Sequence, residues 1–381
     1  MFAVSFSLFF FVDAPTPGDG RERGAGCGVG AVRPAVTGHC LTYRSEGAMY
    51  LSELGLDPGH GFMKWSYRDG SGRIRSGSFR SVALPHIDSA LATSVRRAQA
   101  SSLIQTIAVD GQLFDVDVDE NSSVGKAMGE RNEANDFAGR PEYRALVGAA
   151  FARLDVTRVS TLVLGLPMMT FARYAESLQK QFRGTLTFGS RSVIVDRVHV
   201  VPQGVGSLLM VLAQGDASLV GTTICLMDIG HYTSDWIVGV AQGLAIDFSR
   251  SGGRPGGASH IYRALAEGLS AELGEPFEGL DAIDLALRKG TPLLAFGQPL
   301  DISRYLECGK APALETVRAM RARVRSADDL TIVLTGGGAP LYRDAIATVF
   351  QKNRVVELQQ ARFTNAIGFL LYGEQQALAT R

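Results

Sequence analysis

Short apolar runs alternate along this chain with polar turns rich in glycine, and this pattern predicts an α/β protein. The apolar residues 224–227 end at Asp228 and Gly230, and a second apolar run begins after the turn. A strand, a tight turn and a returning strand give this pattern. Residues 54–65 repeat it, with Asp57, Gly59 and Gly61 in the turn. Two similar hairpins predict two similar lobes that face one ligand.

The remaining periodicity divides the chain into a first lobe at residues 49–217 and a second lobe at residues 218–381. We expect a small β insertion at about 80–140, where residues 103–118 alternate around a turn at Asp110 and Gly111. Residues 159–165 are almost continuously apolar, as in a parallel strand covered on both faces. The glycine-rich residues 251–257 are interpreted as a mobile or ligand-facing loop. Other predicted strands lie near 50–56, 62–68, 74–79, 193–200 and 331–334, and helices lie near 141–153, 170–182, 204–214, 258–273, 280–288, 313–326 and 364–377.

The first 48 residues differ from the rest of the chain. They begin with the apolar residues 2–12 and continue through a stretch rich in proline, glycine and arginine. A signal peptide is one interpretation, but a basic leading segment and a clear cleavage site are missing. We therefore predict that residues 1–48 are a disordered or mis-assigned extension, and that the fold begins at Met49.

Composition changes this picture little. Hydrophobic residues make up 46% of the chain and charged residues 20%, which is ordinary for a globular protein. The 38 basic and 38 acidic side chains cancel, so no overall charge favours direct binding to nucleic acid or to a membrane. Four cysteines without a Cys-x-x-Cys pair favour a reducing compartment, and we expect a cytoplasmic protein.

The two turns carry the residue types that bind phosphate. Backbone N–H groups near Gly230 and the hydroxyls of Thr233 and Ser234 can face phosphate oxygens, and Asp228 can reach a phosphate-bound Mg²⁺. Residues 335–338, Thr-Gly-Gly-Gly, follow another apolar run and could admit a base or ribose against bare backbone. His60 and His231 also lie in the turns. They could bind a metal, but we expect them to pack or hydrogen-bond within the loops.

Together these motifs resemble the actin-like ATPases of the ParM/StbA plasmid-segregation type, within the actin, sugar kinase and heat-shock chaperone superfamily. The similar segments are Asp57-x-Gly59-x-Gly61-x-x-Lys64, Asp228-x-Gly230-x-x-Thr233-x-Asp235, residues 202–206 around Gln203, and Thr335-Gly336-Gly337-Gly338. Residues 130–132, 141–143 and 163–167 most resemble protein D of the PRTRC plasmid system. The commoner second turn is richer in glycine, whereas this chain has His231 and Tyr232 there.

The resemblance implies an actin-like (ribonuclease H-like) fold of duplicated lobes, with a nucleotide cleft between them. It implies ATP and Mg²⁺ as cofactors, with the metal held by Asp57 and Asp228 through its waters. Lys64 would contact phosphate, and Gln203 with Asp235 would align the attacking water. For Gln203 the alternative is an amide that caps backbone groups at the start of a helix. For Asp235 it is a solvated side chain at the start of a strand. Asp57, Gly59, Gly61, Lys64, Gly230, Thr233, Gly336, Gly337 and Gly338 would bind the nucleotide, and Gln203, Asp228 and Asp235 would be catalytic.

Three functions are compatible with these residues. The first is an ATPase that forms filaments by self-association and positions plasmid DNA through a DNA-binding adaptor protein. The second is a small-molecule kinase of the same superfamily. The third is a nucleotide-gated scaffold, in which His231 and Tyr232 crowd the terminal phosphate and hydrolysis is lost.

Overall fold

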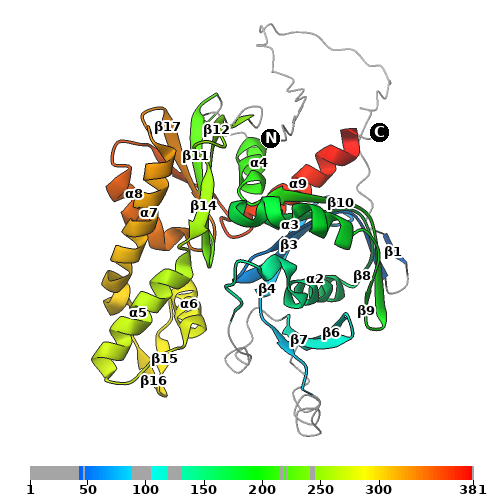
Figure 1. The fold of residues 1–381 in the computed structure, drawn as a ribbon, viewed down its shortest axis with the longest axis horizontal. Coiled ribbons are helices and arrows are strands. Elements are labelled where there is room, and N and C mark those ends of the chain that lie inside the picture. Colours follow the sequence, from blue (N-terminus) through cyan, green and yellow to red (C-terminus); the bar gives the residue numbers. More distant parts are fainter. Residues whose placement is uncertain are drawn as a thin grey trace, which may run out of the picture.

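The computed structural model describes residues 43–45, 48–87, 104–118, 131–214, 218–219, 221–240 and 245–379. These residues form two lobes, each built on one larger β-sheet, with helices α4 (Val205–Gln214) and α9 (Thr364–Ala379) between the sheets (Figure 1). Most of the predicted N-terminal extension lies outside the described residues. The predicted α/β class with two similar sheets is confirmed.

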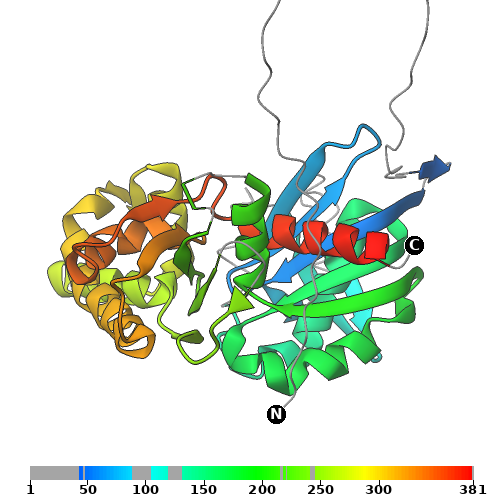
Figure 2. The same cartoon turned by 90° about the horizontal axis from the view of Figure 1, so that it is seen from above.

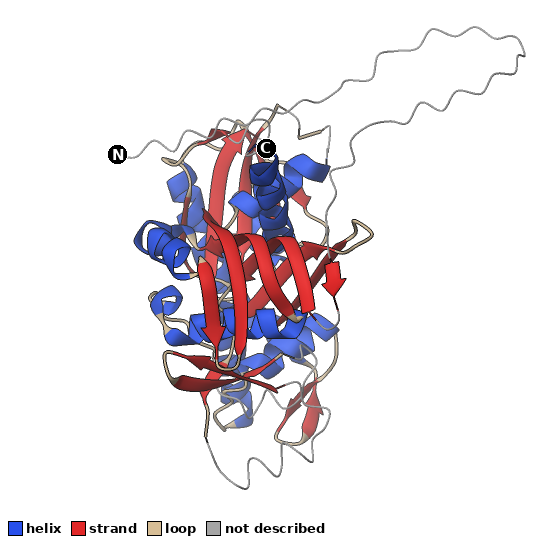
Figure 3. Ribbon diagram, turned by 90° about the vertical axis from the view of Figure 1, so that its right-hand side faces the viewer, coloured by secondary structure: helices blue, strands red, loops and turns tan. Residues whose placement is uncertain are grey.

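Figure 3 views the molecule from the side of the first lobe, whose strands are drawn in red. The sheet of this lobe has the order β4-β3-β2-β8-β10-β9, and β1 pairs with β2. Strand β8 is parallel to both β2 and β10, so the carboxyl ends of these three strands lie at one edge. Strand β1 lies before the predicted start of the fold at Met49 and pairs with residues 48–50. The strands are β1 (Tyr43–Ser45), β2 (Ala48–Pro58), β3 (Phe62–Arg68), β4 (Ile74–Arg80), β8 (Val156–Leu166), β9 (Gly184–Phe188) and β10 (Arg191–Pro202).

Apolar side chains of helix α2 (Pro141–Leu154) and of the strands fill the core of this lobe, and α3 (Met168–Gln181) packs along β10. A separate three-stranded sheet, β5-β7-β6, lies in the region of the predicted insertion. Its strands are β5 (Ala83–Pro85), β6 (Ile104–Val109) and β7 (Gln112–Asp117), and the short helix η2 (Phe137–Gly139) follows. The turn between β6 and β7 is at Asp110 and Gly111, as predicted.

The second sheet has the order β13-β12-β11-β17-β18, and β14 also pairs with β12. As in the first lobe, an antiparallel hairpin supplies a strand, β11, that is parallel to the next central strand, β17. The strands are β11 (Thr223–Ile229), β12 (Thr233–Val240), β13 (Ala245–Ile246), β14 (Gly252–Pro255), β17 (Leu330–Thr335) and β18 (Val355–Glu357).

Helices cover this sheet and extend the lobe away from the first one (Figure 1). They are α5 (Ala258–Leu273), α6 (Leu280–Lys289), α7 (Lys310–Val324) and α8 (Arg343–Val349), with η3 (Ile302–Gly309) and η4 (Ala339–Tyr342). A two-stranded hairpin, β15 (Leu293–Ala295) and β16 (Gln298–Leu300), follows α6. Among the described residues, no helix combines the length and the apolar character needed to cross a membrane.

The prediction of a loop at residues 251–257 is wrong for its central part, because β14 pairs antiparallel with β12. Large side chains of β12 cover this strand. A Cβ atom at Gly252 would lie 2.9 Å from the Trp236 ring, and one at Gly253 would lie 2.2 Å from the Asp235 carboxylate. The glycines therefore make room for neighbouring side chains within a sheet.

Helices α4 and α9 pack against each other and join the lobes (Figure 2). They approach so closely that a Cβ atom at Gly368 would lie 1.8 Å from the carbonyl oxygen of Gly206. Helix α9 also packs on β2 and β8, which confirms that the last helix crosses back to the first lobe. A third apolar cluster, including Val163, Leu226 and Phe369, fills the space between the two sheets.

Candidate functional site

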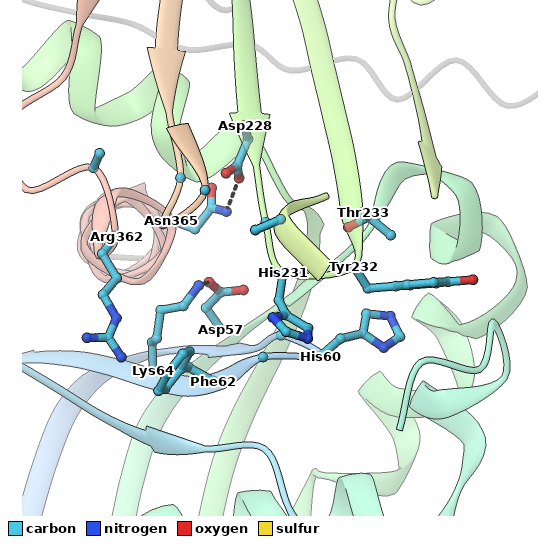
Figure 4. A pocket seen from close by; sticks show the side chains of 18 of the residues that line it. Asp57, His60, Phe62, Lys64, Asp228, His231, Tyr232, Thr233, Arg362 and Asn365 are labelled. Atoms are coloured by element: carbon cyan, nitrogen blue, oxygen red, sulfur yellow. Dashed lines mark hydrogen bonds and ion pairs between the residues drawn. The ribbon is translucent and has the colours of Figure 1, made fainter. Parts of the chain in front are cut away.

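The candidate site lies where the two predicted hairpins face each other, at the carboxyl ends of the central strands. Ligands commonly bind at this edge of α/β sheets. A cavity of about 260 Å³ is present there. Its lining includes Asp57, Gly59, Gly61, Lys64, Gln203, Asp228, Gly230, Thr233, Asp235, Gly336, Gly337 and Gly338. The structure thus brings together the twelve residues predicted to be catalytic or to bind the nucleotide, several of which are labelled in Figure 4.

Asp57 is completely buried near the end of β2. The Lys64 ammonium, on the opposite strand, lies 2.5 Å from Oδ2 of Asp57. The side-chain amide of Gln203, which follows β10, donates to Oδ1 over 2.6 Å. The predicted alternative for Gln203, an amide that caps backbone, does not describe this contact. One carboxylate therefore orients both the lysine and the glutamine.

Asp228 occupies the corresponding position near the end of β11. Its Oδ2 atom accepts a hydrogen bond of 2.6 Å from the Asn365 amide (Figure 4). Burial raises the pKa of Asp228 to about 6, although the Lys64 charge acts in the opposite direction. The two hairpins thus place a buried carboxylate on each side of the cavity.

Sequence reasoning missed Asn365, which fixes Asp228 from the start of α9. The side-chain oxygen of Asn365 accepts hydrogen bonds from Gly204 N, at 3.0 Å, and from the hydroxyl of Ser207, at 2.9 Å. These contacts direct the amide nitrogen toward Asp228. The only sequence signal was a polar pair, Thr364 and Asn365, that opens an apolar helical pattern and is buried in the structure.

Asp235 lies opposite Asp228 in the β11–β12 register. It is 2% exposed, so the alternative of a solvated side chain is wrong. Its Oδ1 atom accepts a hydrogen bond of 2.9 Å from the backbone N–H of Met168, at the start of α3 in the other lobe. Burial, and then the charge of Asp228, raise the pKa of Asp235 to about 7. This carboxylate thus connects the lobes beneath the cavity.

The turn between β11 and β12 is closed by a hydrogen bond of 2.9 Å from Gly230 N to Thr233 O. Thr233 lines the cavity, as predicted. Ser234 does not face the cavity, and this part of the prediction is wrong. Its hydroxyl donates to the carbonyl oxygen of Gly256 over 2.7 Å, because side chains alternate along a strand and Ser234 points into the second lobe.

The glycines after β17 have different roles. Gly336 has φ +93°, and a Cβ atom there would lie 2.5 Å from an oxygen of Asp228. At Gly338 a Cβ atom would lie 2.9 Å from the Ile229 side chain. These two glycines let the turn pack on β11. Only Gly337 of the three has open space beside it, with Arg362 as its nearest neighbour at 3.9 Å.

His60 and His231 pack and hydrogen-bond, as predicted, but their partners lie outside their own loops. His60 Nδ1 is 2.8 Å from the carbonyl oxygen of Asn132, and its ring lies 5.0 Å from that of Tyr232. The side chain of His231 contacts Arg131 and Glu133. Both turns are therefore fixed by contacts between the lobes.

The carboxylates fit a divalent cation better than they fit an empty polar core. Asp57, Asp228 and Asp235 are buried, and the raised pKa values of Asp228 and Asp235 show that a positive charge there would be favourable. The described residues contain no group of three ligands already arranged around one metal position. Mg²⁺ usually binds through one or two carboxylates together with waters and substrate phosphates.

These features are those of the actin-like fold: two duplicated lobes, with carboxylate-bearing hairpins that face each other across a cavity. Residues 55–206 match the family model for the N-terminal domain of actin-like proteins. No curated protein sequence matches the chain.

Solved structures of actin-like proteins share the whole fold. An archaeal actin homolog is 20% identical, with a TM-score of 0.66, and the match covers 87% of this chain and 100% of that one. A ParM filament from Clostridium botulinum gives 18% identity, a TM-score of 0.67, and coverage of 85% and 99%. The actin-like protein Alp7A is 12% identical, with a TM-score of 0.65, and the match covers 87% of this chain and 98% of that one. The chain therefore has the actin-like fold, which confirms the predicted fold class.

Proposed function

We propose that this protein binds and hydrolyses ATP in the cleft between its lobes, and that nucleotide controls its assembly into filaments. The main supporting observation is the convergence of Asp57, Asp228 and Asp235 with Lys64 and Gln203 between two glycine-containing turns. The fold supports the same proposal, because one structure of the archaeal actin homolog is a complex with ADP. Phosphoryl transfer mainly requires positioning and stabilisation of charge, which these residues can supply.

The backbone of both turns would bind the phosphates. Gly59, Gly61 and Gly230 allow close approach to N–H groups, and Thr233 adds a hydroxyl. Lys64 would move its ammonium from Asp57 to a phosphate oxygen. Asp57 and Asp228 would hold Mg²⁺, which supplies positive charge to the phosphate oxygens when bound. Gly337 offers open backbone to the nucleoside.

Gln203 and Asp235 would position the attacking water. The amide nitrogen of Gln203 already donates to Asp57, so its amide oxygen is the atom that can accept a hydrogen bond from the attacking water. Asp235 is buried and has a pKa of about 7, and its carboxylate can accept the proton that the attacking water loses.

The biological setting is the finer part of the proposal. A ParM filament is among the similar structures, and this supports self-association of the present chain. We propose a cytoplasmic role in plasmid segregation or maintenance, with a DNA-binding adaptor as partner, and membership of the protein D family of PRTRC systems. The sequence resemblance at residues 130–132, 141–143 and 163–167 supports that assignment; residue 130 lies outside the described residues.

Sedimentation with different nucleotides tests filament formation. We expect the protein to pellet with ATP and Mg²⁺ and to remain in the supernatant with ADP or without nucleotide. Phosphate release in the same samples reports turnover. Turnover without pelleting at any protein concentration tested would contradict the filament and favour the kinase. Pelleting with ATP but without phosphate release would favour the scaffold.

A further inference from the structure

Arg131 is a buried arginine that the proposed chemistry does not use. It precedes η2 in the first lobe, and its side chain is only 3% exposed. Its guanidinium reaches Asp281 of α6 at 2.7 Å and Asp284 of the same helix at 3.5 Å. It also lies 5.0 Å from the centre of the Phe62 ring. Phe62 follows the turn at residues 59–61, which we call the first phosphate turn; the second phosphate turn is residues 230–232. One side chain therefore connects the first turn to the far lobe.

The same guanidinium holds His231 of the second phosphate turn. Arg131 Nη1 is 3.2 Å from His231 Nδ1 and 3.5 Å from Nε2, and the Glu133 carboxylate is 3.2 Å from Nε2. A carboxylate can only accept, so the contact with Glu133 places a hydrogen on Nε2 of His231. Burial and the Arg131 charge lower the pKa of His231, which is consistent with a neutral ring.

These contacts determine what the unusual second turn presents to the cavity. Both ring nitrogens of His231 are directed to Arg131 and Glu133, and a Cβ atom at Gly61 would lie 2.5 Å from His231 Cβ. The backbone of His231 is in turn fixed to α5, since Ser259 N donates to its carbonyl oxygen over 2.7 Å. The imidazole thus ties the turn to the first lobe and does not offer a nitrogen to a ligand.

From this geometry we propose that Arg131 is a positioning residue, which makes the placement of the second phosphate turn depend on closure of the two lobes. Arg131 and Glu133 belong to the first lobe, whereas His231, Asp281 and Asp284 belong to the second. Separation of the lobes breaks all these contacts together. The inference rests on the proposed function, in which this turn contacts the terminal phosphate. Only ATP carries that terminal phosphate, so the contact of Arg131 with His231 favours the binding of ATP over ADP.

The chain offers a matched control in Arg80. Its guanidinium is also buried and also crosses to Asp281, at 3.3 Å. No contact between Arg80 and His231 is present among the described residues. Replacing Arg80 weakens the attraction between the lobes but leaves the contact of Arg131 with His231. Replacing Arg131 weakens the attraction and also removes that contact.

The experiment measures ATP and ADP affinities and turnover for the full-length parent, Arg131→Gln, Arg131→Lys and Arg80→Gln. We expect Arg131→Gln to weaken ATP binding about tenfold more than ADP binding, as for loss of a charged hydrogen bond. Arg80→Gln should weaken both nucleotides equally. Lysine cannot reach Asp281 and His231 together, so Arg131→Lys should keep ADP affinity and recover only part of the ATP preference.

A double variant tests whether Arg131 acts through His231. If it does, Arg131→Gln combined with His231→Ala should lose no more ATP preference than His231→Ala alone. Thermal unfolding identifies variants that are not folded. If Arg131→Gln is not folded, the ATP-to-ADP ratio of Arg131→Lys tests the inference in its place. An ATP-to-ADP ratio in Arg131→Gln equal to that in Arg80→Gln, or additive losses in the double variant, would overturn the inference. A parent that binds neither nucleotide would instead refute the proposed function.

Discussion

The side chain of Gln203 is held in one orientation by hydrogen bonds of its amide and of its backbone. Its nitrogen is held by Asp57 at 2.6 Å, and its backbone N–H donates to Leu166 O, also at 2.6 Å. Two fixed points orient the amide, and it lines the cavity without being part of either phosphate turn. Removal of this side chain should affect the attacking water more than nucleotide binding.

Gln203→Ala should therefore separate binding from chemistry. We expect ATP affinity to stay within about threefold of the parent while turnover falls about a hundredfold, which is a typical size for effects of positioning and proton transfer. Titration with ATP and phosphate release from one preparation would measure both quantities. Gln179→Ala is a suitable control, because that amide donates to Val198 O and does not line the cavity. Weakened affinity with unchanged turnover per bound ATP would exclude the water-positioning role.

The sequence predicted some site residues and missed others for a physical reason. Asp57 and Lys64 lie in one hairpin, and a two-residue repeat and a tight turn place them opposite each other. Asn365 and Arg131 reach the site from segments far away in sequence, so their contacts depend on how the lobes pack. Only the pairing of hairpins could be predicted from spacing, whereas these distant contacts required the three-dimensional structure.

At the scale of elements, the crossing of α4 and α9 leaves no room for an added side-chain atom. Gly206 and Gly368 bring two helix backbones together, and the apolar residues around them belong to the cluster between the sheets. Ser207 of α4 holds Asn365 of α9, and Asn365 holds Asp228, so the crossing positions the site as well as the lobes.

Gly368→Ala should destabilise the protein by about 3 kcal/mol, because an added methyl group overlaps the α4 backbone and neither helix can move freely. Chemical denaturation of parent and variant would measure the loss. Gly373→Ala is the matched control in the same helix. Its added Cβ would lie 3.3 Å from the Val163 side chain, a contact that a small shift relieves. Equal stability of the Gly368 variant and the parent would show that the helices do not pack this closely.

Elements with strong periodicity were predicted well, and elements defined by tertiary contacts were not. The predicted helix at 258–273 has the observed bounds of α5, and the predicted strand at 62–68 has those of β3. Glycine is rare in strands, so the sequence pattern predicts a loop at residues 251–257. Trp236 and Asp235 override that preference, since their side chains occupy the space above Gly252 and Gly253.

At the scale of the whole molecule, two duplicated sheets present their carboxyl edges to one cavity, and α4, α9 and the contacts of Arg131 and Asp235 hold them together. The hydrophobic pattern predicted the two sheets and the crossing helix. It could not predict how far the cleft is closed, because that depends on charged contacts between segments distant in sequence. The proposed activity depends on this closure, since residues of both lobes would contact the same phosphates.

The central claim is that this cavity hydrolyses ATP, and phosphate release by Asp228→Ala tests it most directly. The parent should release phosphate from ATP in the presence of Mg²⁺. The variant should do so about a thousandfold more slowly, because several kcal/mol of transition-state stabilisation are lost with the carboxylate. Thermal unfolding would confirm that the variant is folded. Equal turnover by variant and parent, or a folded parent that releases no phosphate, would contradict the account.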